Sequence, residues 1–319
     1  MADARWAGAL ADRRGPLMEA RRRIVCATDL TARSDLALSR AVLLAKQTGA
    51  RLTLVHAVDA RKSERQVRAQ VNRAYVQMLS MVDEESAAID VAVKVGGRLD
   101  VIARVANEAN ADVVVLAAPQ RRRLDFLFGT TAERLLRATG RPVLVVHREA
   151  RESYRRVAMA VDLSNVSLPM IQAASKLGVL ENAETTLLHA NSAPLESTLK
   201  TVGVSQQAIE DYRQGWEDDA RLRLQAMSTA ADMPSERTRL LVRTESPALA
   251  IRQMLEWEQP ELLTLGASRW VLIKRLLLGS VTDSLLRTSM SDVLVIPHAI
   301  SSSASRSPIR REFPAASVQ

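Results

Sequence analysis

Cysteine and long apolar runs are the features that this sequence most clearly lacks. Cys26 is its single cysteine, which excludes an internal disulfide and any cysteine-rich metal site. No stretch approaches the roughly 18 consecutive apolar residues of a membrane-spanning helix, so no membrane span is expected. The N-terminus carries Asp3, Asp12 and Glu19 and does not have the pattern of a secretory signal. We therefore expect a cytoplasmic protein whose side chains form no metal site.

Aromatic residues are also scarce, at 3% of the chain, and this affects how its positive charge is interpreted. The formal net charge is +8, and the excess lies within residues 1–150, most densely at Arg21–Arg23 and Arg121–Arg123. Such runs could bind nucleic acid. However, single-strand binding proteins combine basic grooves with aromatic stacking platforms, and this chain has few aromatic rings. We therefore favour solvated surface charge and expect no nucleic-acid partner.

Short apolar runs alternate with helical patterns through the first half of the chain. The runs are typical of strands buried on both faces of a sheet, and they are Ile24–Thr28, Leu52–Val58, Ile89–Val95, Val113–Ala117 and Val143–Val146. Helices are predicted after Ser34 and over residues 62–85, 99–110 and 130–139. We expect Ser34 to be the N-cap of the first helix. Cys26 lies in the middle of the first strand and should be buried.

The same order of elements then begins again, and this repetition determines the expected architecture. The matching segments are Ile24–Thr28 with Val157–Val161, Asp29 with Asp162, His56 and Ala57 with His189 and Ala190, and Val143–Val146 with Val293–Ile296. Two α/β units with parallel sheets follow from this alternation. The expected divisions are a loose leader at residues 1–20, domains at 21–150 and 151–298, and a disordered tail at 299–319.

The second unit contains a longer helix, predicted over residues 205–230. Its apolar residues recur at helical spacing on one stripe, namely Ile209, Tyr212, Trp216, Ala220, Leu224 and Met227. Such a stripe is typical of a helix face that packs on a hydrophobic core. A groove for a partner protein is the alternative, and we favour the core-facing interpretation.

Residues 261–298 carry the clearest candidate site. A short buried strand ends at Gly266, and after a loop Gly279 and Ser280 begin a helix. The first turn of a helix leaves backbone N–H groups unpaired and its dipole favours an anion, so a phosphate could bind there. A glycine after a strand and Gly-Ser before a helix are also ordinary turn and cap chemistry. The spacing alone leaves both interpretations open.

This stretch resembles the nucleotide motif of the universal stress protein family. In that family a glycine, two residues, a second glycine and nine residues precede Gly-Ser or Gly-Thr. Gly266, Gly279 and Ser280 fall on this pattern, whereas Arg269 stands at the position of the second glycine. The resemblance covers residues 21–298, and the double repeat is similar to that of tandem-domain members. It implies two doubly wound domains, each with a five-stranded parallel sheet in the order 3-2-1-4-5 flanked by helices.

The resemblance also implies where an adenine nucleotide, ATP or AMP, would bind. Family members hold it at the carboxyl ends of the strands, near the point where the strand order reverses. An aspartate after the first strand contacts the adenosine, and the residue after the second-strand histidine lines the adenine pocket. The site expected in the second domain comprises Asp162, Ala190, Gly266, Arg269, Gly279 and Ser280. Taken alone, an aspartate after a strand is also an ordinary turn residue.

The first domain departs further from the family pattern. Its corresponding positions are Asp29, Ala57, Gly129 and Thr130. Ala117 replaces the first glycine, and the connection that follows is one residue shorter and contains Pro119, which has no backbone donor. We interpret this as a degenerate site, although Arg121–Arg123 could bind an anion through their guanidinium groups. Nucleotide binding is therefore expected in the second domain only.

The resemblance implies a non-enzymatic stress-response protein, and two other functions stay open. One is a slow ATPase on the same fold, although the sequence has no GxGxxG, Walker-type lysine loop or HExxH motif. The other is a module that binds unknown protein partners and no nucleotide. Family domains also pair through their fifth strands, so Val143–Val146 should lie beside Val293–Ile296 within one chain. Further assembly into a homodimer stays an open alternative.

Overall fold

The computed structural model describes residues 22–61, 63–81, 89–118, 130–164, 166–191, 196–267 and 291–297. In the first half, the strands are β1 (Arg23–Ala27), β2 (Arg51–Val58), β3 (Ile89–Val95), β4 (Val113–Ala117) and β5 (Val143–Val146). The helices of this half are α1 (Ala32–Thr48), α2 (Glu64–Ser80), α3 (Arg98–Glu108) and α4 (Thr130–Thr139).

The second half repeats this alternation. Its strands are β6 (Arg156–Val161), β7 (Glu184–Ala190), β8 (Thr238–Arg243), β9 (Leu262–Gly266) and β10 (Asp292–Ile296). Its helices are α5 (Ser167–Lys176), α6 (Glu196–Thr201), α7 (Gln206–Ala230), the 3-10 helix η1 (Ser235–Arg237) and α8 (Pro247–Trp257). α8 begins with a proline, which cannot donate to a preceding turn and so is tolerated at the first helical position.

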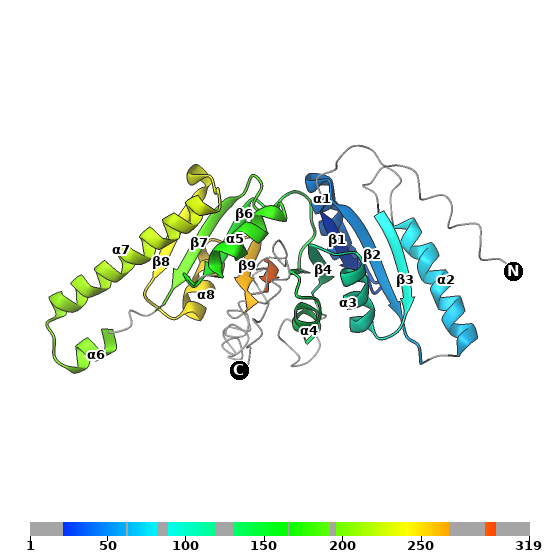
Figure 1. Cartoon of the computed structure of the whole chain (residues 1–319), viewed down its shortest axis with the longest axis horizontal. Coiled ribbons are helices and arrows are strands. Elements are labelled where there is room, and N and C mark those ends of the chain that lie inside the picture. Colours follow the sequence, from blue (N-terminus) through cyan, green and yellow to red (C-terminus); the bar gives the residue numbers. More distant parts are fainter. Residues whose placement is uncertain are drawn as a thin grey trace, which may run out of the picture.

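The described strands form one sheet in the order β3-β2-β1-β4-β5-β10-β9-β6-β7-β8. Each half of this order is 3-2-1-4-5, so the strand order expected for both domains is confirmed. Figure 1 shows the sheet crossing the molecule along its long axis, with α2 near one end and α6 and α7 near the other. Within each half the neighbouring strands are parallel, as the crossover helices require.

The two halves meet where β5 pairs with β10, a junction that we call the seam. This pairing is antiparallel, with Leu144 opposite Leu294 and Val143 opposite Val295. The prediction that these strands lie side by side is therefore confirmed. Because the seam is antiparallel, the carboxyl ends of the first-half strands and the amino ends of the second-half strands face the same edge of the sheet.

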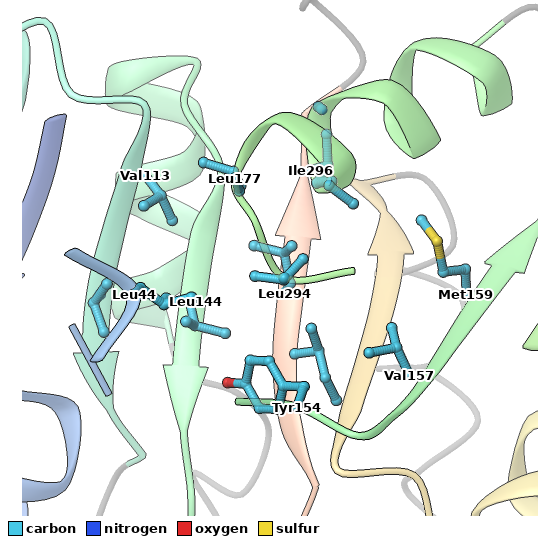
Figure 2. Packing of buried hydrophobic residues seen from close by; sticks show 14 of the residues in the cluster. Leu44, Val113, Leu144, Tyr154, Val157, Met159, Leu177, Leu294 and Ile296 are labelled. Atoms are coloured by element: carbon cyan, nitrogen blue, oxygen red, sulfur yellow. The ribbon is translucent and has the colours of Figure 1, made fainter. Parts of the chain in front are cut away.

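A hydrophobic core covers each face of the sheet and continues across the seam. On one face, Leu144, Tyr154, Leu294 and Ile296 belong to the same buried cluster, which Figure 2 shows at close range. A second cluster covers the other face and likewise draws residues from both halves. Burial of a Leu or Ile side chain stabilises a fold by about 1.5–3 kcal/mol. These shared clusters therefore join the two repeats into one packed unit.

Two expectations about burial are confirmed. Cys26 is 0% exposed and lies inside β1. On α7, Ile209 and Leu224 are buried, and Trp216 packs against the core. The stripe on this helix is therefore a core-facing surface. No helix in the described ranges is both long and apolar enough to cross a membrane.

The start of the first helix was predicted wrongly. α1 begins at Ala32 with Thr31 at its N-cap, so Ser34 lies inside the first turn. The Ser34 hydroxyl donates to the Thr31 carbonyl over 2.7 Å and lies 2.8 Å from the Thr28 hydroxyl. The residue that caps a helix depends on backbone angles that the sequence pattern does not fix. α2 also ends earlier than predicted, at Ser80, and α6 was not predicted.

Candidate functional site

The sheet places Asp162 and Gly266 beside each other, at the point where the strand order reverses. β6 and β9 are parallel neighbours with Ala160 opposite Leu265. Gly266 ends β9 and Asp162 follows β6 directly, so both lie at the carboxyl edge of this pair. In doubly wound folds this reversal opens a crevice outside the strand ends where ligands bind. The structure therefore brings together two of the residues predicted for the second-domain site.

The first domain has the same arrangement with one difference. β1 and β4 are parallel, with Ile24 opposite Val113, just as Val157 lies opposite Leu262 in the second domain. Counting along each strand from these pairs, Asp29 corresponds to Asp162 and Ala117 to Gly266. The register thus confirms the alignment in which alanine replaces the first motif glycine.

Asp162 organises the turn that leads from β6 into α5. Its Oδ1 accepts hydrogen bonds from the Ser164 backbone N–H over 3.1 Å and from the Ser167 hydroxyl over 2.8 Å. The Ser164 hydroxyl also donates to this oxygen. Aspartate bonded to the backbone two residues ahead is an ordinary turn device. This structural role of Asp162 is therefore established whatever else the carboxylate binds.

Asp29 makes the corresponding turn in the first domain. Its Oδ1 accepts from the Thr31 N–H over 3.2 Å and from the Thr31 hydroxyl over 2.6 Å. Partial burial opposes ionisation, but hydrogen bonds from Thr31 and Ser34 and the positive charge of Arg98 outweigh it and lower the pKa of Asp29. The carboxylate is therefore ionised at neutral pH.

The residue after each aspartate has a left-handed backbone, which the sequence analysis missed. Leu30 has φ of 61° and Leu163 has φ of 58°. A left-handed conformation costs an L-residue roughly 1–2 kcal/mol of conformational energy. Asparagine or glycine in the sequence would have indicated such a conformation, whereas leucine does not. Strained residues of this kind concentrate at binding sites. Because Leu30 and Leu163 occupy the same place in the two repeats, this left-handed conformation is a shared structural feature of the two turns.

Two histidines connect the second strand of each repeat to the first. Nδ1 of His56 lies 2.9 Å from the Thr28 carbonyl, and Nδ1 of His189 lies 3.1 Å from the Val161 carbonyl. The His189 ring also contacts Trp216 of α7, with ring centroids 5.6 Å apart. These contacts fix the strand ends that precede Asp29 and Asp162.

The two alanines predicted to line an adenine pocket follow these histidines. Ala190 ends β7, is 4% exposed and belongs to a buried apolar cluster that includes Ile251. Ala57 is partly buried and packs against the same cluster, which draws residues from both repeats. Their small side chains therefore contribute to the apolar wall beneath the carboxyl edge.

Gly266 is not required by packing. A Cβ atom built at this position would come within 3.6 Å of the Met170 sulfur, an ordinary van der Waals distance. An alanine would therefore fit, as Ala117 does in the first domain. Packing therefore does not explain the glycine. We interpret it as a residue that leaves the backbone at the crevice uncovered by a side chain.

The phosphate half of the expected site lies outside the described residues. This applies to Arg269, Gly279 and Ser280 in the second domain and to Gly129 in the first. Thr130 is the first residue of α4. Their roles stay predictions.

A large cavity lies elsewhere, at the seam. It has a volume of about 690 Å³ and is lined by residues such as Arg40, Arg148, Leu255 and Ser291. Because Ser291 precedes β10 and Arg148 follows β5, this cavity is at the amino edge of the second-domain strands, opposite Asp162. Within the described ranges, no three His, Cys, Asp or Glu residues are grouped in a way that could hold a metal ion.

Solved structures share this double fold. A universal stress protein from Archaeoglobus fulgidus aligns with a TM-score of 0.56 and 16% identity, over 86% of this chain and 96% of its own. A protein of unknown function from Pseudomonas aeruginosa, PA1789, aligns with a TM-score of 0.55 and 18% identity, over 87% and 93% of the two chains. At this level of identity the likeness is one of fold.

Sequence comparison agrees with the fold. Universal stress proteins Mb2346c of Mycobacterium bovis and Rv2319c of Mycobacterium tuberculosis are each 28% identical over 209 residues, which is 63% of this chain and 68% of theirs. The universal stress protein family model matches twice, over residues 20–147 and 153–297. These two matches account for most of the chain, which therefore belongs to the universal stress protein family as a tandem member.

Proposed function

We propose that this tandem universal stress protein binds one adenine nucleotide, ATP or AMP, at the carboxyl edge of its second domain and does not turn it over. The observation that supports this most is the position of Asp162 beside Gly266 where the strand order reverses. Ligands of doubly wound folds bind at this place. The strained turn at Leu163 adds a second sign that the edge is built for binding.

Gly266 supports the phosphate side of the proposal. A Cβ there would meet only the Met170 sulfur, at 3.6 Å, and Gly266 is partly exposed, so a group that enters the crevice could approach its backbone. Phosphates bind backbone N–H groups closely where no side chain intervenes. Gly279 and Ser280 would supply further backbone N–H groups at the start of a helix. Arg269 would add a positive charge that attracts the phosphate.

Asp162 supports the adenosine side. Its Oδ1 is held by Ser164 and Ser167, which fixes the direction of the whole carboxylate at the edge of the sheet. An ionised carboxylate accepts hydrogen bonds, and ribose hydroxyl groups are donors. Because the turn fixes the carboxylate before a ligand arrives, little conformational entropy is lost on binding.

We propose the absence of turnover because the two histidines near the site make structural contacts. Nδ1 of His56 and of His189 is already used in a contact with a backbone carbonyl. The contact holds each ring against the end of the neighbouring strand, and the proposal assigns both histidines this structural role. The proposal places the protein in the cytoplasm, an expectation that rests on its composition.

A matched pair of substitutions tests the proposal. Gly266→Ala gives the second domain the residue of the first, and Ala117→Gly does the reverse. Calorimetric titration with ATP and with AMP should show binding weakened at least about tenfold, or about 1.4 kcal/mol, by Gly266→Ala and unchanged by Ala117→Gly. Both variants should keep the fold, since either residue fits at these strand ends.

Other outcomes would identify the alternatives. Release of ADP and phosphate from bound ATP, measured over hours, would favour the slow ATPase. No binding of either nucleotide by the unaltered protein would favour the protein-binding module. Equal losses in both variants would contradict confinement to the second domain.

A further inference from the structure

The sheet formed by the described residues ends in two edge strands, β3 and β8. The fifth strands of the two repeats, β5 and β10, are already paired with each other at the seam. An edge strand presents a row of backbone N–H and C=O groups that can pair with another chain. Figure 1 shows β3 with α2 at one end of the molecule. Within the described ranges, no strand pairs with the outer side of β3.

The backbone groups on the outer side of β3 belong to its odd-numbered residues. The Gly96 N–H donates to the Val58 carbonyl of β2 over 2.9 Å, so this even-numbered position faces inward. Consecutive residues of a strand direct their N–H and C=O groups to opposite sides, so Val91, Val93 and Val95 face outward. A partner strand must form its hydrogen bonds with these residues, which limits the possible registers.

The sequence of β3 complements itself when two copies run antiparallel about Ala92. In this register Val91 of one copy lies opposite Val93 of the other, and the two exchange backbone hydrogen bonds. Asp90 lies opposite Lys94 in a pair without hydrogen bonds, where side chains come closer together. Registers centred on Val91 or on Val93 lose these pairs of opposite charge. The charges of β3 therefore favour a single register.

The two charged residues of this edge are available for such pairing. Lys94 is exposed and forms no ion pair among the described residues. A lysine on an edge strand ordinarily opposes association, unless the partner brings a carboxylate to it. Asp90 already accepts from Arg51 over 2.5 Å, but both side chains are exposed to solvent. Because a carboxylate has acceptor sites for several donors, Asp90 can bind a lysine as well.

Helix α2 supplies an apolar flank beside the same edge. Met78 of this helix is buried, and Gln77 on one side of it donates to the Leu30 carbonyl over 3.5 Å. Leu30 follows β1, so Gln77 marks the inner side of the helix. Tyr75 and Leu79 lie on the other side of Met78 around the helix axis, toward the free edge. Their side chains are 47% and 48% exposed.

The other edge strand does not complement itself in this way. β8 occupies the place of β3 in the second repeat, and by strand register Arg239 and Arg243 stand where β3 has Asp90 and Lys94. The same antiparallel register would place Arg239 of one copy opposite Arg243 of the other. Like charges directly opposite each other destabilise a strand pair. The two edges of the sheet therefore differ in their ability to pair with a second copy.

We propose that the β3 edge is the interface of a homodimer in which two chains pair antiparallel about Ala92. Asp90 of each chain then pairs with Lys94 of the other. The flanks of α2 that carry Tyr75 and Leu79 meet across the two-fold axis, which covers exposed apolar surface. A symmetric contact of this kind closes at two chains. This interface goes beyond the proposed nucleotide binding and uses none of the residues assigned to that site.

Charge reversal tests the interface, in the full chain freed of nucleotide. Sedimentation velocity over a concentration series up to about 100 µM should show a reversible equilibrium between monomer and dimer. Lys94→Asp and Asp90→Lys each place like charges opposite each other, so each variant alone should dimerise at least about tenfold more weakly. An equimolar mixture of the two variants should regain the dimer, because its pairs are again opposite in charge. Arg239→Asp on β8 is the matched control and should dimerise like the unaltered chain.

A cysteine at the two-fold axis tests the register independently of these charges. Two copies of position 92 would face each other in a pair without hydrogen bonds, with Cα atoms about 4.5 Å apart, which is within disulfide range. Mild oxidation of Ala92→Cys should therefore give a covalent dimer on a non-reducing gel. Leu241→Cys, at the same place on β8, should stay monomeric. The native Cys26 is buried and does not compete.

Four results would overturn this inference. The first is a monomer throughout the concentration series. The second is assembly beyond two chains, which would indicate an open contact between different edges. The third is no recovery of the dimer in the mixture of Lys94→Asp and Asp90→Lys. The fourth is equal cross-linking of the Ala92→Cys and Leu241→Cys variants, which would indicate random collision.

Discussion

Arg40 of α1 and Asp292 of β10 form an ion pair across the seam, with Nε and Oδ2 3.4 Å apart and side chains that are 4% and 0% exposed. The two residues are 252 positions apart in the chain and come from different repeats. A buried carboxylate is costly unless it is paired and hydrogen-bonded. Asp292 meets this condition only when β5, β10, Tyr154 and α1 are all in place. The pair therefore ties the repeats together.

The first prediction concerns the stability that this pair provides. Arg40→Met removes the cation and leaves Asp292 buried, so it should lower the free energy of unfolding by about 3–5 kcal/mol. Urea unfolding followed by circular dichroism measures this. The matched control is Arg51→Met, which breaks an exposed pair with Asp90 and should cost no more than about 1 kcal/mol. Equal costs would show that the seam pair has no special role.

The second prediction concerns pH and compares two aspartates whose pKa values shift in opposite directions. Burial raises the pKa of Asp292, and hydrogen bonds from Tyr154 and the His147 N–H together with the charge of Arg40 offset it only in part. A raised folded pKa means stability that is present below the usual value of 3.8 and lost as pH rises through the folded value. The free energy of unfolding of the unaltered protein, relative to Asp292→Asn, should therefore fall as pH rises over that window.

The contribution of Asp29 to the free energy of unfolding should change with pH in the opposite direction. Its pKa is lowered, so its contribution is present above the unfolded value and lost as pH falls through the folded one. Relative to Asp29→Asn, the unaltered protein should gain stability as pH rises from acid. Urea midpoints collected across the acid range check both slopes, and slopes of the same sign would contradict the opposite environments of the two carboxylates.

The third prediction concerns Cys26. The thiol is 0% exposed, and burial raises its pKa to about 12, so almost no thiolate is present at neutral pH. A thiol reagent should modify it only as fast as the protein unfolds, and addition of urea should accelerate the reaction. Rapid labelling of the native protein would show that β1 opens locally and would contradict the packing described.

The fourth prediction concerns the phosphate loop. Gly279→Leu should abolish ATP binding because its side chain would occupy the place where backbone N–H groups meet phosphate. Gly129→Leu, at the corresponding position of the first domain, should leave binding nearly intact. Calorimetric titration compares the two variants. Loss of binding in the Gly129→Leu variant, with binding kept in Gly279→Leu, would place the nucleotide in the first domain instead.

The fold was predictable from the sequence because repetition and buried strands leave few alternatives. Val143–Val146 and Val293–Ile296 are apolar throughout, which predicts strands buried on both faces, and the family resemblance implied the pairing of these strands that the seam confirms. Most of the candidate site was not derivable in this way. The aspartates were found through family resemblance, while the strain at Leu30 and Leu163 had no signal, since leucine does not favour a left-handed backbone.

The contact between Arg40 and Asp292 was also beyond sequence reasoning. Arg40 falls on a helix among apolar residues, and Asp292 directly precedes the predicted strand Val293–Ile296, where an aspartate would ordinarily be taken for a turn residue. Their contact depends on how two domains dock, which neither local propensity nor hydrophobic periodicity encodes. The correspondence of Ala117 with Gly266, by contrast, was predicted and is confirmed by strand register.

The most direct test of the central proposal is the stoichiometry of ATP binding to the unaltered chain, measured by calorimetric titration after bound nucleotide has been removed. A single site per chain that is weakened by Gly266→Ala and kept in Ala117→Gly is the predicted result. Two sites per chain, or a single site that survives Gly266→Ala unchanged, would contradict nucleotide binding beside Asp162 in the second domain.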